Sequence, residues 1–252
     1  MSMLSEKELE KYSRQILIEK VGIKGQEKIK RSSIILIGCG GLGTSAAQYL
    51  AMAGIGKIKI VDSDKVELSN LNRQTLLFEK DIGKKKTEAL IKTLKKINPD
   101  AELKIENTKI QKNNINQLLE NHQIVIDCTD NFKSRYLINK SCFYNKKILV
   151  SAALQNFDVQ ALALAPWKNE KNPCYECVFP KTKINNELNC DQMGILAPIA
   201  GLGGILQAIL TINIILGANY GIFREFHSFD CFNRNFKKIR IRKNNDCKIC
   251  KI

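Results

Sequence analysis

Histidine is scarce in this chain, with His122 and His227 as its two examples among 252 residues. Catalysis or metal binding that needs several imidazoles is therefore excluded. The polar N-terminal residues 1–14 lack the apolar core of a signal peptide, which predicts a cytoplasmic protein. Nine cysteines in such a protein are expected to be thiols or metal ligands, and not disulfides.

Charge is absent from the segment between Asp191 and Arg224, and residues 195–216 are mostly apolar. This stretch is long enough to span a bilayer. Proline, glycine and polar residues interrupt it, however, and an all-round apolar helix is also expected inside a protein or at a subunit interface. We therefore predict a buried or interface helix and no membrane span.

The chain is basic, with 40 Lys and Arg against 25 Asp and Glu, a net charge of +15. A basic surface attracts polyanions such as nucleic acid or nucleotide phosphates. The excess is spread along the whole chain, without an aromatic-interleaved basic patch or a recognition helix. We therefore predict that the chain has no nucleic-acid partner. A basic zinc-containing nucleic-acid-binding protein is an alternative.

Strands and helices are expected to alternate through the first 150 residues. Short apolar runs at 34–37, 57–61, 124–126 and 148–150 are typical of strands buried on both faces, with a weaker strand at 103–106. Helices are expected at 84–97 and 132–144. Later strands at 160–165, 223–229 and 238–242 are expected to be antiparallel. The pattern predicts a doubly wound, Rossmann-like, mostly parallel α/β sheet.

A glycine turn follows the first strand and opens a helix, with Gly38, Gly40 and Gly43 in the GxGxxG spacing. Glycines there let backbone N–H groups approach phosphate at a helix N-terminus. Asp62, at the end of the next strand, is placed to accept hydrogen bonds from ribose hydroxyls. These residues predict a nucleotide site and leave open whether the nucleotide is NAD or ATP.

Cationic and acidic residues follow at the same edge of the sheet. Arg73 lies in a polar loop, and the helix after it opens with Lys84, Lys85 and Lys86, of which at least one is expected to bind phosphate. Asp127 and Asp130 follow the strand at 124–126. Either carboxylate could hold Mg²⁺ or cap the next helix, and Asp130 is the better metal candidate.

Two CxxC pairs, Cys174 with Cys177 and Cys247 with Cys250, supply the four thiolates of a structural zinc site. A redox role is the weaker alternative. The pairs are far apart in the sequence, so their proximity is an assumption at this stage. The remaining thiols Cys39, Cys128, Cys142 and Cys231 are expected to be packing residues.

Five motifs resemble, in order and spacing, the ThiF/MoeB/HesA family of ubiquitin-activating-enzyme-like adenylyltransferases. They are residues 11–15, the glycine turn, residues 62–74, Lys86 and residues 128–132, and the likeness covers essentially the whole chain. It implies one adenylation domain over 1–252, with a helical segment to about residue 30, a nucleotide-binding part over 31–150, and a carrier-binding and zinc part over 151–252.

The resemblance also implies the roles of individual residues. ATP contacts fall on Gly41, Asp62, Ser69, Asn70, Leu71, Asn72, Arg73, Lys86, Asp130 and Asn131. Asp130 corresponds to the magnesium ligand, and Arg14 to an arginine that reaches the phosphates from the other subunit of a homodimer. The CxxC pairs correspond to zinc ligands. Cys190 matches a cysteine that is covalently linked to the carrier in some members and dispensable in others.

The implied reaction is ATP-dependent adenylation of the C-terminal glycine carboxylate of a ubiquitin-like sulfur-carrier protein with a Gly-Gly tail. It would serve thiamine or molybdopterin biosynthesis, and the sequence does not distinguish these carriers from another pathway or a free peptide. No sulfurtransferase-like segment is present, which predicts a separate persulfide donor. An NAD(P)-dependent dehydrogenase is the main alternative, but it gives Arg73, Lys86 and the CxxC pairs no common purpose.

Overall fold

The computed structural model describes residues 3–181 and 194–251, and in these ranges its strands form one sheet in the order β3-β2-β1-β4-β5-β6-β7-β8. Strands β3 (Glu102–Glu106), β2 (Lys57–Val61), β1 (Ser33–Ile37), β4 (Ile124–Asp127) and β5 (Ile148–Gln155) are mutually parallel. Strands β6 (Asp158–Leu164), β7 (Glu225–Asp230) and β8 (Asn235–Arg240) continue antiparallel. The predicted fold class is confirmed.

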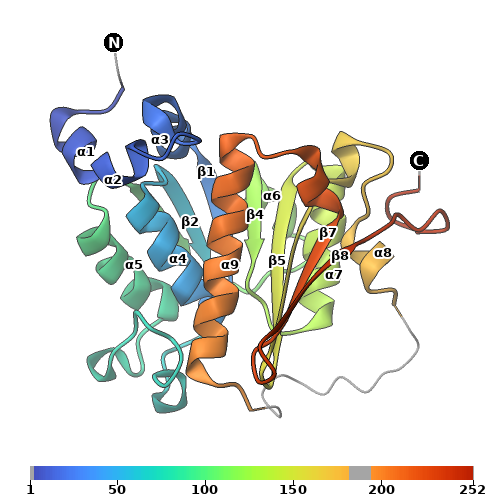
Figure 1. The fold of residues 1–252 in the computed structure, drawn as a ribbon. Coiled ribbons are helices and arrows are strands. Elements are labelled where there is room, and N and C mark those ends of the chain that lie inside the picture. The colour runs from blue at the N-terminus through green and yellow to red at the C-terminus, as the bar shows by residue number, and fades with distance from the viewer. Residues whose placement is uncertain (1–2, 182–193, 252) are drawn as a thin grey trace.

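Helices cover both faces of the sheet (Figure 1). Helices α4 (Gly41–Ala53), α5 (Lys86–Ile97) and α9 (Ala197–Leu216) share one core with the side chains of Ile34, Leu36, Ile58 and Ile60. Helices α6 (Ile115–Leu119), α7 (Phe132–Tyr144) and α8 (Tyr175–Val178) pack on the other face, against Ile35, Ile37 and Val125. Successive residues of β1 thus enter opposite cores, as its unbroken apolar run requires.

The N-terminal segment forms three helices, α1 (Glu6–Lys11), α2 (Ser13–Ile16) and α3 (Gly22–Arg31), at one end of the sheet (Figure 1). A capping box starts α1: the Ser5 hydroxyl accepts from the Glu8 N–H, and the Glu8 carboxylate accepts from the Ser5 N–H. Tyr12 lies against Gly54 and is 4 % exposed, which anchors the segment to the end of α4.

Helix α9 passes the length and composition test for a membrane span, with a mean hydropathy of 2.0. It packs against α4, β5 and β6, and 44 % of its most apolar window is buried. Gly204 approaches the Leu42 carbonyl so closely that a Cβ would lie 2.5 Å from it, so small residues let α9 and α4 meet. One side of α9 is therefore core, and residues such as Ile209 stay exposed on the other.

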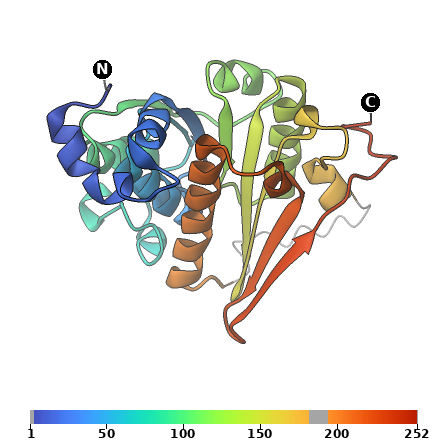
Figure 2. The same cartoon turned by 45° about the horizontal axis from the view of Figure 1, so that its top comes forward.

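The antiparallel strands extend the sheet beyond α9, as Figure 2 shows for the β7–β8 hairpin. The predicted strands differ from β6, β7 and β8 by one to three residues at their ends, and β5 runs to Gln155, past the predicted end at 150. The hairpin is half-buried to exposed, so its residues lack the apolar alternation that defines a strand end in sequence. Helix α6 was not predicted at all.

Candidate nucleotide and metal sites

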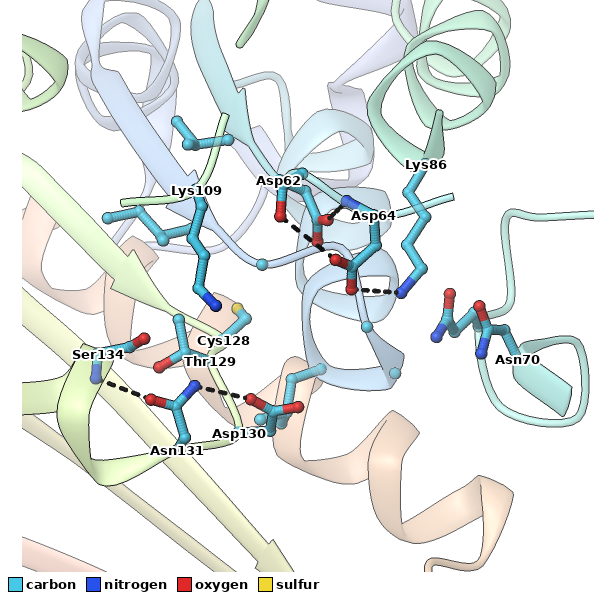
Figure 3. Close-up of a pocket in the computed structure, with 18 of the residues that line it drawn as sticks. Asp62, Asp64, Asn70, Lys86, Lys109, Cys128, Thr129, Asp130, Asn131 and Ser134 are labelled. Atoms are coloured by element: carbon cyan, nitrogen blue, oxygen red, sulfur yellow. Dashed lines mark hydrogen bonds and ion pairs between the residues drawn. The ribbon is translucent and has the colours of Figure 1, made fainter. Parts of the chain in front are cut away.

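A cavity of about 520 Å³ opens at the carboxyl ends of β1, β2 and β4. Its walls are the β1–α4 glycine turn, the loop from β2 to α5, the loop after β3 and the loop from β4 to α7, several of whose side chains point into it (Figure 3). This volume suits a small-molecule ligand. Strand β2 pairs with β1 on one side, and β4 pairs with β1 on the other side. The cavity therefore lies at a topological switch point of the sheet.

Two glycines make the β1–α4 turn possible. Gly38 has a φ of +101°, and a Cβ there would lie 2.7 Å from the Cys128 carbonyl oxygen. A Cβ on Gly43 would overlap the Gly38 carbonyl oxygen. By contrast, Gly40 faces open space and leaves the start of α4 without a side-chain cap. The first turn of α4 can therefore receive an anion.

Asp62 joins the glycine turn to the β2–α5 loop. Its Oδ2 accepts from the Cys39 N–H at 2.6 Å, and its Oδ1 accepts from the Asp64 N–H at 2.7 Å. These two bonds fix the carboxylate at the end of β2, with lone pairs left on both oxygens. A ribose hydroxyl in the cavity could donate to it.

The three consecutive lysines at the start of α5 have different partners. Lys84 pairs with Asp81 at 3.0 Å, and the Lys85 ammonium donates to the Ser63 carbonyl. Lys86 lines the cavity and is 8 % exposed. Its ammonium lies 3.1 Å from Asp64 Oδ2, which keeps a buried cation paired.

Arg73 enters the cavity wall from the same loop. Its guanidinium donates to the Ser69 carbonyl at 2.9 Å and to Asn72 Oδ1 at 3.1 Å, so the loop holds it in place. The side chain packs close to Gly41 at the start of α4. Arg73 and Lys86 therefore bring two cations to one cavity.

The two acids after β4 are separated by the structure. Asp127 is fully buried and accepts from the Thr129 N–H and hydroxyl and from the Ser151 hydroxyl. Asp130 lines the cavity, where Asn131 Nδ2 donates to its Oδ1 at 3.0 Å. The N-cap of α7 is Asn131, whose Oδ1 accepts from the Ser134 N–H. Neither acid caps the helix, and Asp130 is the one placed for a cation.

The predicted nucleotide residues that line the cavity are Gly41, Asp62, Asn70, Arg73, Lys86, Asp130 and Asn131. Ser69, Leu71, Asn72 and Arg14 are not among its lining residues in this single chain. Cys190 lies outside the described residues. Asp64, Lys109, Thr129 and Arg135 also line it and were not predicted individually as site residues. The position of Lys109 just after β3 was the available signal, because loops after parallel strands meet at this edge.

The four cysteines of the CxxC pairs form a second site, which we call the Cys cluster. Cys174, Cys177, Cys247 and Cys250 have sulfur atoms within 4.8 Å of one another, with distances of 3.8, 3.5 and 3.4 Å between individual pairs. A tetrahedron with zinc–sulfur bonds of about 2.3 Å has edges of about 3.8 Å, so the cluster fits such an ion. Hydrogen bonds within the cluster lower the pKa of the Cys177 thiol and raise the pKa of the Cys174 thiol.

The other described thiols are not members of this cluster. Cys39, Cys128 and Cys142 are fully buried, and burial raises the pKa of each above its ordinary value. They are packing residues, as predicted. Cys231 is half-buried, directly after β7.

A glycine turn, two cations and two acids at the switch point of a parallel sheet are typical of a nucleotide-binding α/β protein. The model of the ThiF family matches residues 12–249. The chain therefore belongs to the ThiF family, and the predicted family is confirmed.

Relatives and solved structures agree with this placement. The chain is 40 % identical over 249 residues to the adenylyltransferase and sulfurtransferase MOCS3 of Aedes aegypti, covering 98 % of this chain and 56 % of that protein. It is 32 % identical to the sulfur carrier protein adenylyltransferase of Thermus thermophilus, with 98 % and 92 % covered. The crystal structure of E. coli MccB with ATP has the same fold, with a TM-score of 0.83 at 23 % identity over 95 % of this chain and 74 % of that one. The chain spans about half the length of the MOCS3 relatives.

Proposed function

We propose that this protein adenylates the C-terminal carboxylate of a ubiquitin-like sulfur-carrier protein with ATP and releases pyrophosphate. The observation that carries the proposal is the convergence of Arg73, Lys86, Asp62 and Asp130 on the cavity beside the glycine turn. The similarity to the Thermus sulfur carrier protein adenylyltransferase and to a probable molybdopterin-synthase adenylyltransferase from Gracilaria tenuistipitata, 33 % identical, supports the same reaction. The second relative favours the molybdopterin pathway, and thiamine biosynthesis is the alternative.

The chemistry needs positioning and charge neutralisation more than proton transfer. A carrier carboxylate is ionised at neutral pH, so it attacks the α-phosphorus of ATP without a general base, and pyrophosphate leaves. Lys86 and Arg73 stabilise the negative charge that develops on the phosphate oxygens. Asp62 orients the ribose and the start of α4 receives phosphate oxygens. The scarcity of histidine is consistent with this reaction.

Two metal ions complete the proposal. Asp130, which accepts a hydrogen bond from Asn131, would hold Mg²⁺, and the ion would neutralise part of the triphosphate charge. The Cys cluster would hold Zn²⁺ with four thiolates and no open position, so its role is structural. It joins the segment after β8 to α8. Buried thiols without a disulfide partner, such as Cys39 and Cys142, support a cytoplasmic location, because disulfides are rare in that reducing compartment.

We further propose a homodimer in which Arg14 acts on the partner's cavity. Arg14 is exposed and does not line the cavity of its own chain. Large apolar side chains are exposed near it and along α4 and α9, among them Leu17, Ile18, Met52 and Ile209, at 48–76 %. A second copy would cover such surface. Cys190 as the site of a covalent carrier adduct and a separate persulfide donor remain part of this proposal.

Carrier-dependent ATP–pyrophosphate exchange tests the function. The zinc-loaded chain is mixed with candidate carriers that end in Gly-Gly. Lys86→Ala and Arg73→Ala should each lower the exchange rate by at least about a hundredfold, as for loss of a group that stabilises transition-state charge. Lys84→Ala is the matched control, because Lys84 pairs with Asp81 and does not line the cavity; it should exchange at nearly the normal rate.

Two results would reject the assignment. The first is near-normal exchange in both cavity variants with folding unchanged. The second is tight binding of NAD, with no binding of ATP in the presence of Mg²⁺, which would favour the dehydrogenase alternative.

A further inference from the structure

Helix α7 connects the Cys cluster to the cavity. Arg135 and Asn139 are one turn apart on its buried side, with 6 % and 2 % exposure. A buried guanidinium and a buried carboxamide each need polar partners. The partners of these two side chains lie in the two sites described above.

Arg135 contacts the loop that carries Asp130. Its Nη2 donates to the Thr129 carbonyl oxygen at 2.6 Å. The Thr129 N–H and hydroxyl donate to the buried carboxylate of Asp127, at 3.0 and 2.7 Å. Both backbone polar groups of Thr129 are thus fixed by buried charged groups. Because Asp130 is the next residue, these bonds set where its backbone starts and limit how far its carboxylate can swing in the cavity.

Asn139 contacts the Cys cluster. Its Nδ2 lies 3.7 Å from the Cys174 sulfur, and its Oδ1 accepts from the Tyr175 N–H at 2.9 Å. A hydrogen bond to a ligand sulfur orients the ligand and stabilises its thiolate. Asn139 therefore holds two consecutive residues, one of which belongs to the cluster.

Tyr175 links the contacts of Asn139 to those of Arg135. Its side chain is 2 % exposed and packs in the core of the α7 face. The Arg135 guanidinium lies beside its phenol. The residue after a cluster cysteine thus touches both Asn139, through its backbone, and Arg135, through its side chain.

We propose that Arg135, Asn139 and Tyr175 are positioning residues that couple the Cys cluster to the Asp130 loop. Metal bound by the cluster fixes Cys174 and Tyr175, which restricts Arg135 and with it Thr129. Metal in the cluster therefore strengthens binding of ATP with Mg²⁺, and the nucleotide strengthens metal binding by the same factor. The inference rests on the proposed function for the identity of the nucleotide and of the metal.

The test measures binding and needs no turnover. The full chain is prepared with and without Zn²⁺, and the dissociation constant of a non-hydrolysable ATP analogue with Mg²⁺ is measured by calorimetry. Wild-type protein should bind the analogue about tenfold more weakly without Zn²⁺, within the usual range for coupled sites. In Asn139→Ala the two dissociation constants should agree within about twofold, while the zinc-loaded variant still binds the analogue.

The matched control is Asn145→Ala, which removes the same group from the C-terminal end of α7. Asn145 donates to Asn116 and to the Ser141 carbonyl, and contacts neither the cavity nor the cluster. This variant should keep the full tenfold effect. Retention in Asn145→Ala and loss in Asn139→Ala together distinguish a specific connection from general weakening of the helix.

A second readout covers the case in which the metal-free chain unfolds. With Co²⁺ in the cluster, addition of the analogue should shift the thiolate-to-cobalt absorption bands of wild-type protein and leave those of Asn139→Ala unchanged. The coupling would be overturned if the analogue did not shift the bands of wild-type protein. It would also be overturned if the analogue shifted those of Asn139→Ala equally. Failure of the zinc-loaded protein to bind the analogue would remove both this inference and the proposed function, whereas coupling without carrier-dependent exchange would remove the proposed function alone.

Discussion

Lys86 and Asp64 form an ion pair in the wall of the cavity, with 3.1 Å between Nζ and Oδ2. The Lys86 side chain is 9 % exposed and the Asp64 side chain 63 % exposed. The Lys86 N–H also donates to the Asp64 carbonyl at 3.0 Å. A nucleotide phosphate that approaches Lys86 therefore meets an ammonium that is already in position and already paired with an anion.

Replacement of Asp64 by Asn should strengthen binding of ATP in the absence of divalent cations. The substitution removes a negative charge that competes with phosphate for Lys86 and repels it. At this exposure the gain should be about two- to tenfold in the dissociation constant, and it should shrink as salt is added. Titration calorimetry in EDTA at two salt concentrations measures it.

The control for Asp64→Asn is Glu102→Gln, which removes one negative charge from β3, where Glu102 pairs with Lys57 and Lys104 outside the cavity. It should leave ATP binding unchanged. Weaker ATP binding by Asp64→Asn in EDTA would contradict a competing role and show that the carboxylate supports the site.

Substitution by alanine should affect stability at Gly43 and ATP binding at Gly40. A Cβ on Gly43 overlaps the Gly38 carbonyl, so Gly43→Ala should lower the free energy of unfolding by about 2 kcal/mol or more. A Cβ on Gly40 meets nothing within 4 Å, so Gly40→Ala should keep its stability. Because Gly40 lines the cavity, however, the added methyl should obstruct phosphate and weaken ATP binding. Urea unfolding and calorimetry measure the two effects; stable Gly43→Ala protein, or unaltered binding by Gly40→Ala, would contradict them.

The nucleotide half of the fold was predictable because its signals are local. Buried strands in a parallel sheet are short apolar runs, and the glycine turn joins the first of them to α4 in adjacent residues. Helix α7 was predicted at its observed bounds, 132–144, because the polar loop that runs through Asn131 marks its start, although its N-cap is Asn131 and not one of the two predicted acids. The exposed β7–β8 hairpin lacks such a pattern, and its bounds shifted accordingly.

The site was predictable as a set of residues and not as a set of partners. Three consecutive lysines have equivalent chemistry in the sequence, yet Asp81 pairs with Lys84 and Asp64 pairs with Lys86. These choices depend on tertiary contacts between the β2–α5 loop and the start of α5. Proximity of the two CxxC pairs, 73 residues apart, likewise depends on the path of the chain through α9, β7 and β8.

His122 should make the protein less stable in mild acid. Its ring shares a 2.8 Å hydrogen bond with the Ser33 hydroxyl and is 9 % exposed. Burial lowers its pKa from 6.5 to about 4, and the charges of Lys59 and Lys147 add to this. Between pH 4 and pH 6.5 the unfolded chain therefore binds more protons than the folded chain, and the free energy of unfolding falls as pH falls through this window.

The expected loss across that window is about 3 kcal/mol, since each pKa unit corresponds to about 1.4 kcal/mol. Urea unfolding of wild-type and His122→Gln protein from pH 4 to pH 7 isolates the contribution, because titration of carboxylates is common to both. His227→Gln is the control and should keep the His122 contribution. Parallel pH profiles for wild-type and His122→Gln protein would show that His122 has the same pKa in the folded and the unfolded chain, and would contradict the prediction.

Arg14 provides a test of action across subunits. Arg14→Ala protein and Lys86→Ala protein should each be nearly inactive in carrier-dependent exchange as homodimers. In the heterodimer, the chain with Arg14→Ala keeps its own Lys86 and receives the intact Arg14 of its partner. One of the two sites is then complete, so a heterodimer isolated with two affinity tags should show about half of wild-type activity. The second cavity lacks Lys86 and receives no Arg14 from its partner, so it stays inactive. A heterodimer of verified composition with no more activity than the homodimers would place the function of Arg14 elsewhere.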